Sequence, residues 1–73
     1  MMEIRKYIAE QFKGNEYHFK CDCLLALDVK GRVVDYIIEK DEIILYVAVE
    51  GKIMKIGLNH PNLKIKQLNG VIN

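Results

Sequence analysis

The spacing of apolar residues changes once along the chain, at Gly14-Asn15. Before this point Ile4, Ile8 and Phe12 recur every four residues with polar side chains between them, as on one face of an amphipathic helix. Gly14 can adopt the left-handed backbone conformation that often ends a helix. We therefore expect a helix over residues 2–13, with this apolar stripe as its packing face.

After Gly14 the apolar residues alternate with polar ones, which predicts half-buried β-strands. The predicted strands cover residues 17–27, 33–39, 43–49, 53–58 and 63–68. The first is long for a strand and predicts a bend or bulge. Every predicted connector is hairpin-short, including a turn at 28–31 with Gly31 at positive φ. The strands should therefore form an antiparallel meander with residues 43–49 at its centre.

The predicted turns also set the cross-strand register. They place Leu45 opposite both Tyr36 and Ile56, Val34 opposite Val47, and Lys66 opposite Lys55. One face is then apolar throughout and should form the core. Its members are Cys21, Cys23, Leu25, Val34, Tyr36, Ile38, Ile43, Leu45, Val47, Met54, Ile56, Leu58, Leu63 and Ile65.

The opposite face of the sheet is unusually apolar for a two-layer protein. It carries Leu24, Ala26, Val33, Ile37, Ile44, Tyr46, Ala48 and Ile53 among its charged residues. A single helix can cover only one face. The other must be covered by curling of the sheet or by a second chain, unless the helix itself docks on it.

A helix followed by five short antiparallel strands resembles the small SH3-like and Sm-like barrels. The resemblance implies an α+β, mainly β fold: an N-terminal helix and a five-stranded antiparallel meander curled into a small barrel or half-barrel. It concerns architecture only, since the sequence signatures of Sm proteins are absent. Shared architecture by itself implies no function.

Length and composition narrow the classes of protein. A chain of 73 residues with 51% hydrophobic residues predicts one small folded domain, residues 1–73. A net charge of +1 argues against a polybasic membrane or DNA binder. The longest apolar run, residues 43–49, is far shorter than the roughly 20 residues of a membrane span. With no export signal in the first ten residues, we expect a cytoplasmic protein, and the Ile-, Lys- and Asn-rich composition suggests a bacterial one.

Candidate catalytic chemistry is sparse. The chain has no Ser or Thr and no glycine-rich phosphate loop. Cys21, Cys23 and His60 are the possible metal ligands or nucleophiles, but on a strand the two cysteines fit two small core residues better. We therefore expect neither an enzyme nor a cofactor or metal site.

Two binding functions follow from the remaining features. The first is a protein-interaction module, a possible dimer, whose contact residues are Val33, Asp35, Ile44, Tyr46 and Ile53. The alternative is a small nucleic-acid-binding protein. Residues 51–73 contain no acidic residue, and their four lysines would then bind nucleic acid: Lys52, Lys55, Lys64 and Lys66. The same lysines can instead protect an edge strand from aggregation.

Overall fold

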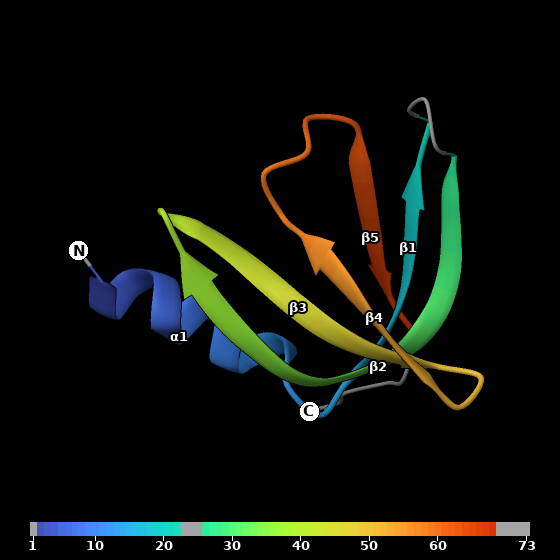
Figure 1. The fold of residues 1–73 in the computed structure, drawn as a ribbon, viewed down its shortest axis with the longest axis horizontal. Helices are drawn as coiled ribbons and strands as arrows, with labels where there is room; N and C mark the ends of the chain where they lie inside the picture. Colours follow the sequence, from blue (N-terminus) through green and yellow to red (C-terminus); the bar gives the residue numbers. More distant parts are fainter. Residues whose placement is uncertain (1, 23–25, 69–73) are drawn as a thin grey trace.

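The computed structural model describes residues 2–22 and 26–68 and consists of one helix and one sheet (Figure 1). Helix α1 (Met2–Phe12) comes first. The strands follow as β1 (Glu16–Cys21), β2 (Leu27–Glu39), β3 (Glu42–Val49), β4 (Lys52–Gly57) and β5 (Leu63–Gln67). All neighbours are antiparallel, in the order β4-β3-β2-β1-β5. The predicted N-terminal helix and five-stranded antiparallel sheet are confirmed.

The turns that follow the helix and flank β3 behave as the sequence predicts. Gly14 has a φ of 87°, and its N–H donates to the carbonyl of Val33, so the chain leaves the helix directly onto the sheet. Lys40-Asp41 and Glu50-Gly51 both have positive φ at their two central residues. This is the twist that matches a two-residue hairpin turn to its strands.

The predicted turn at residues 28–31 is wrong. These residues lie inside β2, which pairs with β1 from Glu16 opposite Arg32 to Cys21 opposite Leu27. β1 and β2 are therefore separate antiparallel strands, and the predicted strand 17–27 covers β1 and only the first residue of β2. The inward alternation of Leu27, Val29 and Val33 continues across the supposed turn, which is why the segment stays extended.

Gly31 has a packing role in place of the predicted turn role. It is not one of the residues with positive φ. A Cβ atom at this position would clash with the backbone carbonyl of Ala48 and the side chains of Val47 and Val49. The glycine therefore lets β2 approach the end of β3 closely where the sheet bends.

The meander prediction fails at the last strand. β5 pairs with β1 and not with β4, so β2 lies at the centre of the sheet in place of residues 43–49. Lys66 is opposite His18, not Lys55. β4 contacts only β3 and β5 contacts only β1, so the sheet is not closed into a barrel. The short segment after β4 carries the chain to the opposite edge of the sheet because β2 bends between its two halves (Figure 1).

The core lies on the inner face of the bent sheet. Its buried members are Ala9, Tyr17, Phe19, Cys21, Val33, Ile43, Leu45, Val47 and Ile56. The predicted register holds between β3 and β4 and for Tyr36 opposite Leu45, but it fails at Val34. A β-bulge between Val33 and Asp35 places Val33 opposite Val47, so Val33 is buried and Val34 is 40% exposed. A bulge adds one residue to a strand, so the residues on one side of it point to the opposite face from the one that strict alternation predicts.

Other core predictions have mixed outcomes. Met54 and Ile65 face inward near the open side of the sheet and are each 37% exposed. The predictions for Cys23, Leu24 and Leu25 lie outside the described residues. Tyr17 and Phe19, which pack as tilted rings 5.8 Å apart, are core residues that the sequence analysis left out.

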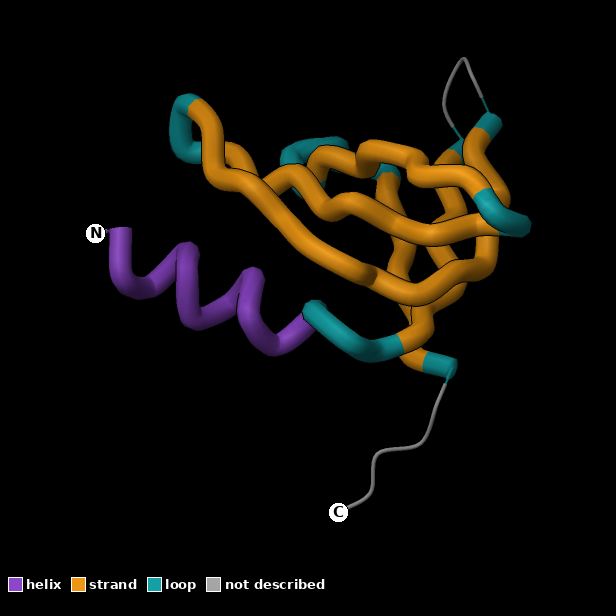
Figure 2. Tube along the Cα trace, turned by 60° about the horizontal axis from the view of Figure 1, so that its bottom comes forward, coloured by secondary structure: helices purple, strands orange, loops and turns teal. Residues whose placement is uncertain are grey.

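Helix α1 packs on the inner, core-bearing side of the sheet (Figure 2). Its buried contacts come from Ala9 and Phe12, whereas Ile4 and Ile8 are 61% and 43% exposed, so the predicted stripe is only partly correct. Ala9 matters because a small side chain lets the helix backbone approach the sheet closely. No helix among the described residues is long and apolar enough to span a membrane.

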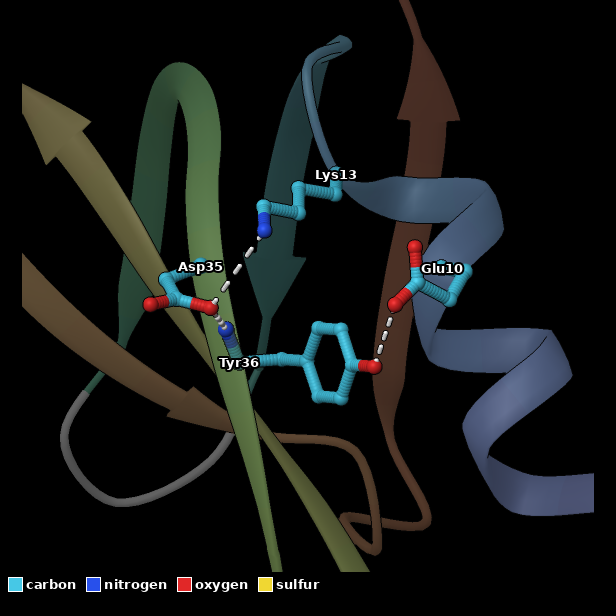
Figure 3. A network of polar contacts seen from close by, with 4 residues as sticks. All are labelled: Glu10, Lys13, Asp35 and Tyr36. Atoms are coloured by element: carbon cyan, nitrogen blue, oxygen red, sulfur yellow. Dashed lines mark hydrogen bonds and ion pairs between the residues drawn. The ribbon is translucent and has the colours of Figure 1, made fainter. Parts of the chain in front are cut away.

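Polar contacts hold the helix in place (Figure 3). The Tyr36 hydroxyl donates a 2.6 Å hydrogen bond to Glu10, and the Lys13 ammonium lies 3.9 Å from Asp35. At the other end of the helix, the Arg5 guanidinium donates to the backbone carbonyl of Asp41. These contacts link α1 to β2 and to the β2–β3 turn.

The bulge predicts opposite effects for two adjacent valines. Val33→Ala should lower the free energy of unfolding by about 1.5–3 kcal/mol, because it removes a fully buried side chain. Val34→Ala is the matched control and should cost much less. Urea denaturation of both variants measures this difference. A larger loss at Val34 would restore the register predicted from sequence.

Tyr36 makes docking of the helix sensitive to alkali. The hydrogen bond to Glu10 raises the pKa of Tyr36 above 10.0, because ionisation would place two negative charges together. The contact therefore stabilises the fold fully below pH 10 and is lost as the pH rises through the raised pKa. Tyr36→Phe should flatten the fall in stability above pH 10. Tyr7→Phe, at an exposed helix position, should retain it.

Candidate functional site

The outer face of the sheet, opposite α1 and the core, divides into two chemically different halves. The half formed by β3, β4 and the end of β2 is mainly apolar. The half formed by β5, β1 and the start of β2 is mainly basic. The division falls where β2 bends, since β2 pairs with β1 through its first half and with β3 through its second.

The apolar half is centred on β3, where Ile44, Tyr46 and Ala48 alternate with the buried core residues. Cross-strand partners extend it onto both neighbours: Ile44 is opposite Ile37, and Ala48 is opposite Ile53, which is 58% exposed. We call these five residues, Ile37, Ile44, Tyr46, Ala48 and Ile53, the outer apolar patch. α1 packs on the inner side of β2 and β3, so the helix does not cover it.

A charged row crosses the centre of the patch. Asp35, Tyr46 and Lys55 are directly paired across three strands, as follows from the predicted register of Leu45 with Tyr36 and Ile56. Lys66, the fourth member of the row in that register, lies on β5 instead. The Lys55 ammonium lies 5.7 Å from the centre of the Tyr46 ring, within range of a cation–π interaction. Asp35 accepts a 2.8 Å hydrogen bond from the backbone N–H of Tyr36, and the same carboxylate lies 3.9 Å from the Lys13 ammonium at the end of α1. The row thus has a negative end, an aromatic centre and a positive end.

The structure separates the residues that the sequence predicts for partner binding. Asp35, Ile44, Tyr46 and Ile53 lie together on the outer face. Val33 does not, because the bulge turns it into the core, where it is fully buried. We therefore leave Val33 out of the candidate contact surface.

The four lysines predicted for nucleic-acid binding also separate. Lys52 and Lys55 lie on β4, at one edge of the sheet, whereas Lys64 and Lys66 lie on β5, at the other. β5 pairs with β1, so Lys64 is directly opposite Lys20, and Lys66 is opposite His18. Lys30 of β2 lies on the other side of His18. We call Lys20, Lys30, Lys64 and Lys66 the lysine array.

Lys20, Lys30 and His18 were not predicted as site residues, because they join Lys64 and Lys66 only through strand pairing between distant parts of the chain. The alternation of β1 does place His18 and Lys20 on one face. Nothing in the local pattern indicates that the last strand returns to pair with the first.

His18 and Asp28 form a close pair at the side of the array. The His18 Nε2 atom lies 2.6 Å from an Asp28 carboxylate oxygen. This hydrogen bond is the main reason that the pKa of Asp28 is lowered from its usual value of 3.8, with smaller contributions from the charges of His18, Lys20 and Lys30. The contact stabilises the carboxylate, so it strengthens above pH 3.8 and is lost as the pH falls through the lowered pKa.

A separate apolar hollow of about 370 Å³ lies at the unclosed side of the sheet. Leu27, Met54, Ile56 and Leu63 contribute to its lining, and Cys21 and His60 also border it. The Cys21 sulfur lies 3.4 Å from the His60 Nδ1 atom. A catalytic thiol of this kind also needs an orienting group on the imidazole.

No third metal-binding side chain joins Cys21 and His60 within residues 2–22 and 26–68. Structural zinc sites usually have four ligands. The predicted candidate Cys23 lies outside the described residues. The described geometry therefore supports no metal site.

The His18–Asp28 pair predicts a specific titration. In a carbon-detected NMR titration, the carboxyl group of Asp28 should have a pKa below 3.8, and His18→Ala should raise it. His60→Ala, on the loop before β5, should leave it unchanged. An unaltered Asp28 titration in His18→Ala would contradict the described contact.

Comparison with known proteins assigns no family: no family model, no curated protein and no solved structure matches this chain. The fold and its two outer surfaces are therefore the basis on which a function can be inferred.

Proposed function

We propose that this protein is a non-enzymatic binding module that self-associates through the outer apolar patch. The observation that carries the proposal is the side of the sheet on which α1 packs. Ala9 and Phe12 belong to the core on the inner face, and Tyr36, which faces that core, bonds to Glu10. The helix is thus committed to one face, and the apolar residues of the other need a different cover.

The composition of the patch fits a protein contact. One aromatic residue, Tyr46, lies at the centre among aliphatic side chains, with Asp35 and Lys55 at the rim. Interfaces commonly combine an aromatic anchor with apolar neighbours and a charged margin. Ile53 is 58% exposed and adjoins the half-buried Ile44, Tyr46 and Ala48, so together they form one continuous apolar surface and not a single exposed side chain.

The charges of the row favour a second copy of the same chain as the partner. If two copies pack face to face about a two-fold axis parallel to β3, the direction of the row is reversed between them. Asp35 of each copy then lies opposite Lys55 of the other, and the two Tyr46 rings meet near the axis. A two-fold interface has to be self-complementary, and this row meets the condition because its negative end faces the positive end of the second copy.

The proposal includes no catalysis. The Cys21 thiol is buried, and within the described residues His60 has no side-chain partner besides Cys21. The hollow beside them is more simply an incompletely filled edge of the core, since its lining is mainly apolar.

We also propose that the fold is an open relative of the small SH3-like and Sm-like barrels. Pairing of the first strand with the last and the bend of β2 support this assignment. The absence of contact between β4 and β5 marks the departure from a closed barrel. This architectural assignment contributes nothing to the functional proposal.

Sedimentation equilibrium of the whole chain tests self-association. The wild type should dimerise at micromolar concentrations, and Tyr46→Asp should weaken the dimer about 30-fold or more, the effect of losing about 2 kcal/mol at an interface centre. Tyr7→Asp is the matched control, because it introduces the same charge at an exposed tyrosine on the helix, and should change little.

Charge reversal tests the two-fold geometry separately. Asp35→Lys and Lys55→Asp should each weaken the dimer, and the double variant should recover part of the loss. Asp35→Lys also removes the contact with Lys13, so Lys13→Gln, which removes that contact alone, is the control and should leave the dimer unchanged. A wild type that stays monomeric at high micromolar concentration would overturn self-association. Failure of the double variant to recover would overturn only the proposed orientation.

A further inference from the structure

The basic half of the outer face brings together lysines that are distant in sequence. Lys20 of β1 and Lys64 of β5 are directly paired, and the pair His18–Lys66 comes two residues further along. These four side chains border one shallow hollow of about 190 Å³, together with Ile65. Among the residues that the structure describes, no carboxylate lines this hollow.

Edge protection does not account for this arrangement. Lysines on an exposed edge strand can block pairing with another sheet, and Lys64 and Lys66 of β5 fit that role. Lys20 does not, because β1 lies between β2 and β5, and Lys30 does not, because β2 is the central strand. The array therefore extends over the outer face of the sheet, and protection of the edge strand explains only two of its four lysines.

The array also opposes the stability of the sheet. Like charges placed directly opposite on neighbouring strands destabilise the pair, and Lys20 and Lys64 are so placed. Within the described part of the chain, none of the four lysines forms an ion pair. Asp28 is opposite Lys20 on this face and offsets part of the charge of Lys20 and Lys30, but its hydrogen bond is to His18. One carboxylate beside four lysines leaves a net positive charge, which an external anion could neutralise.

The extent of the array indicates the kind of anion. It crosses three strands, which is about 10 Å at the usual strand spacing, and two residues along each strand, which is about 7 Å. A single phosphate cannot reach all four ammonium groups over that area, whereas a chain of phosphates can. The array consists of lysines, and the His18 ring among them is hydrogen-bonded to Asp28, so the contact would involve the backbone and not the bases.

We propose that the lysine array binds the phosphodiester backbone of nucleic acid without sequence preference. Lys20, Lys64 and Lys66 contact phosphates around the hollow, and Lys30 extends the contact across β2. Lys52 and Lys55 take no part, because they lie at the opposite edge of the sheet. The site is distinct from the outer apolar patch, so nucleic-acid binding does not require self-association.

Fluorescence anisotropy with a labelled 15-nucleotide oligothymidine tests the proposal. At 50 mM salt the wild type should bind, and the slope of log affinity against log salt should be about −2 to −3, as for three to four neutralised phosphates on a single strand. Lys64→Gln/Lys66→Gln should weaken binding at least about tenfold and reduce the steepness of the slope by about 1.4. Circular dichroism should show this variant as stable as the wild type, or more so.

Lys40→Gln/Lys52→Gln is the matched control, because it removes the same two charges outside the array and should bind nearly as well as the wild type. Equal losses in the two double variants would overturn the site, since binding would then follow net charge alone. No binding of the oligonucleotide at 50 mM salt would also overturn it. Binding of inorganic polyphosphate without the oligonucleotide would overturn the nucleic-acid assignment. Unchanged binding by Tyr46→Asp would support the independence of the two surfaces.

Discussion

The bend of β2 is the constraint on which the rest of the structure depends. Its 13 residues pair with β1 at one end and β3 at the other, so two small sheets share one strand and fold around a common core. Gly31 permits the close approach, and the bulge after Val33 re-aims the chain. The bend brings both halves of the sheet to the one core on which α1 packs.

The same bend explains why the outer surface has two characters. The outward-facing residues of β3 and β4 are mainly apolar, and those of β1 and β5 are mainly charged. Because these two pairs of strands lie on opposite sides of the bend, the apolar and the charged side chains occupy separate parts of the outer face. One chain can therefore carry an apolar contact surface and a basic surface without either crossing the other.

The small size of the domain limits how much of the apolar surface the chain itself can bury. A domain of 73 residues buries a modest fraction of its surface, and here its one helix is used on the inner face. Burial of the outer apolar patch by a second copy would extend the effective core. The lysines opposite one another on β1 and β5 act in the other direction, because like charges so placed lower the stability of the sheet.

Local chemistry in the sequence determined the helix, the hairpin turns at Lys40-Asp41 and Glu50-Gly51, and the row Asp35–Tyr46–Lys55, since each depends on residues close in the chain. Period-two alternation does not record a bulge, so the sequence could not distinguish Val33 from Val34 as the core residue. It also cannot show which strand the last one joins. Only the tertiary structure decided that β5 returns to β1, and with it that Lys64 meets Lys20. Strand pairing over long sequence separations is decided by the shape of the whole sheet, which local pattern does not contain.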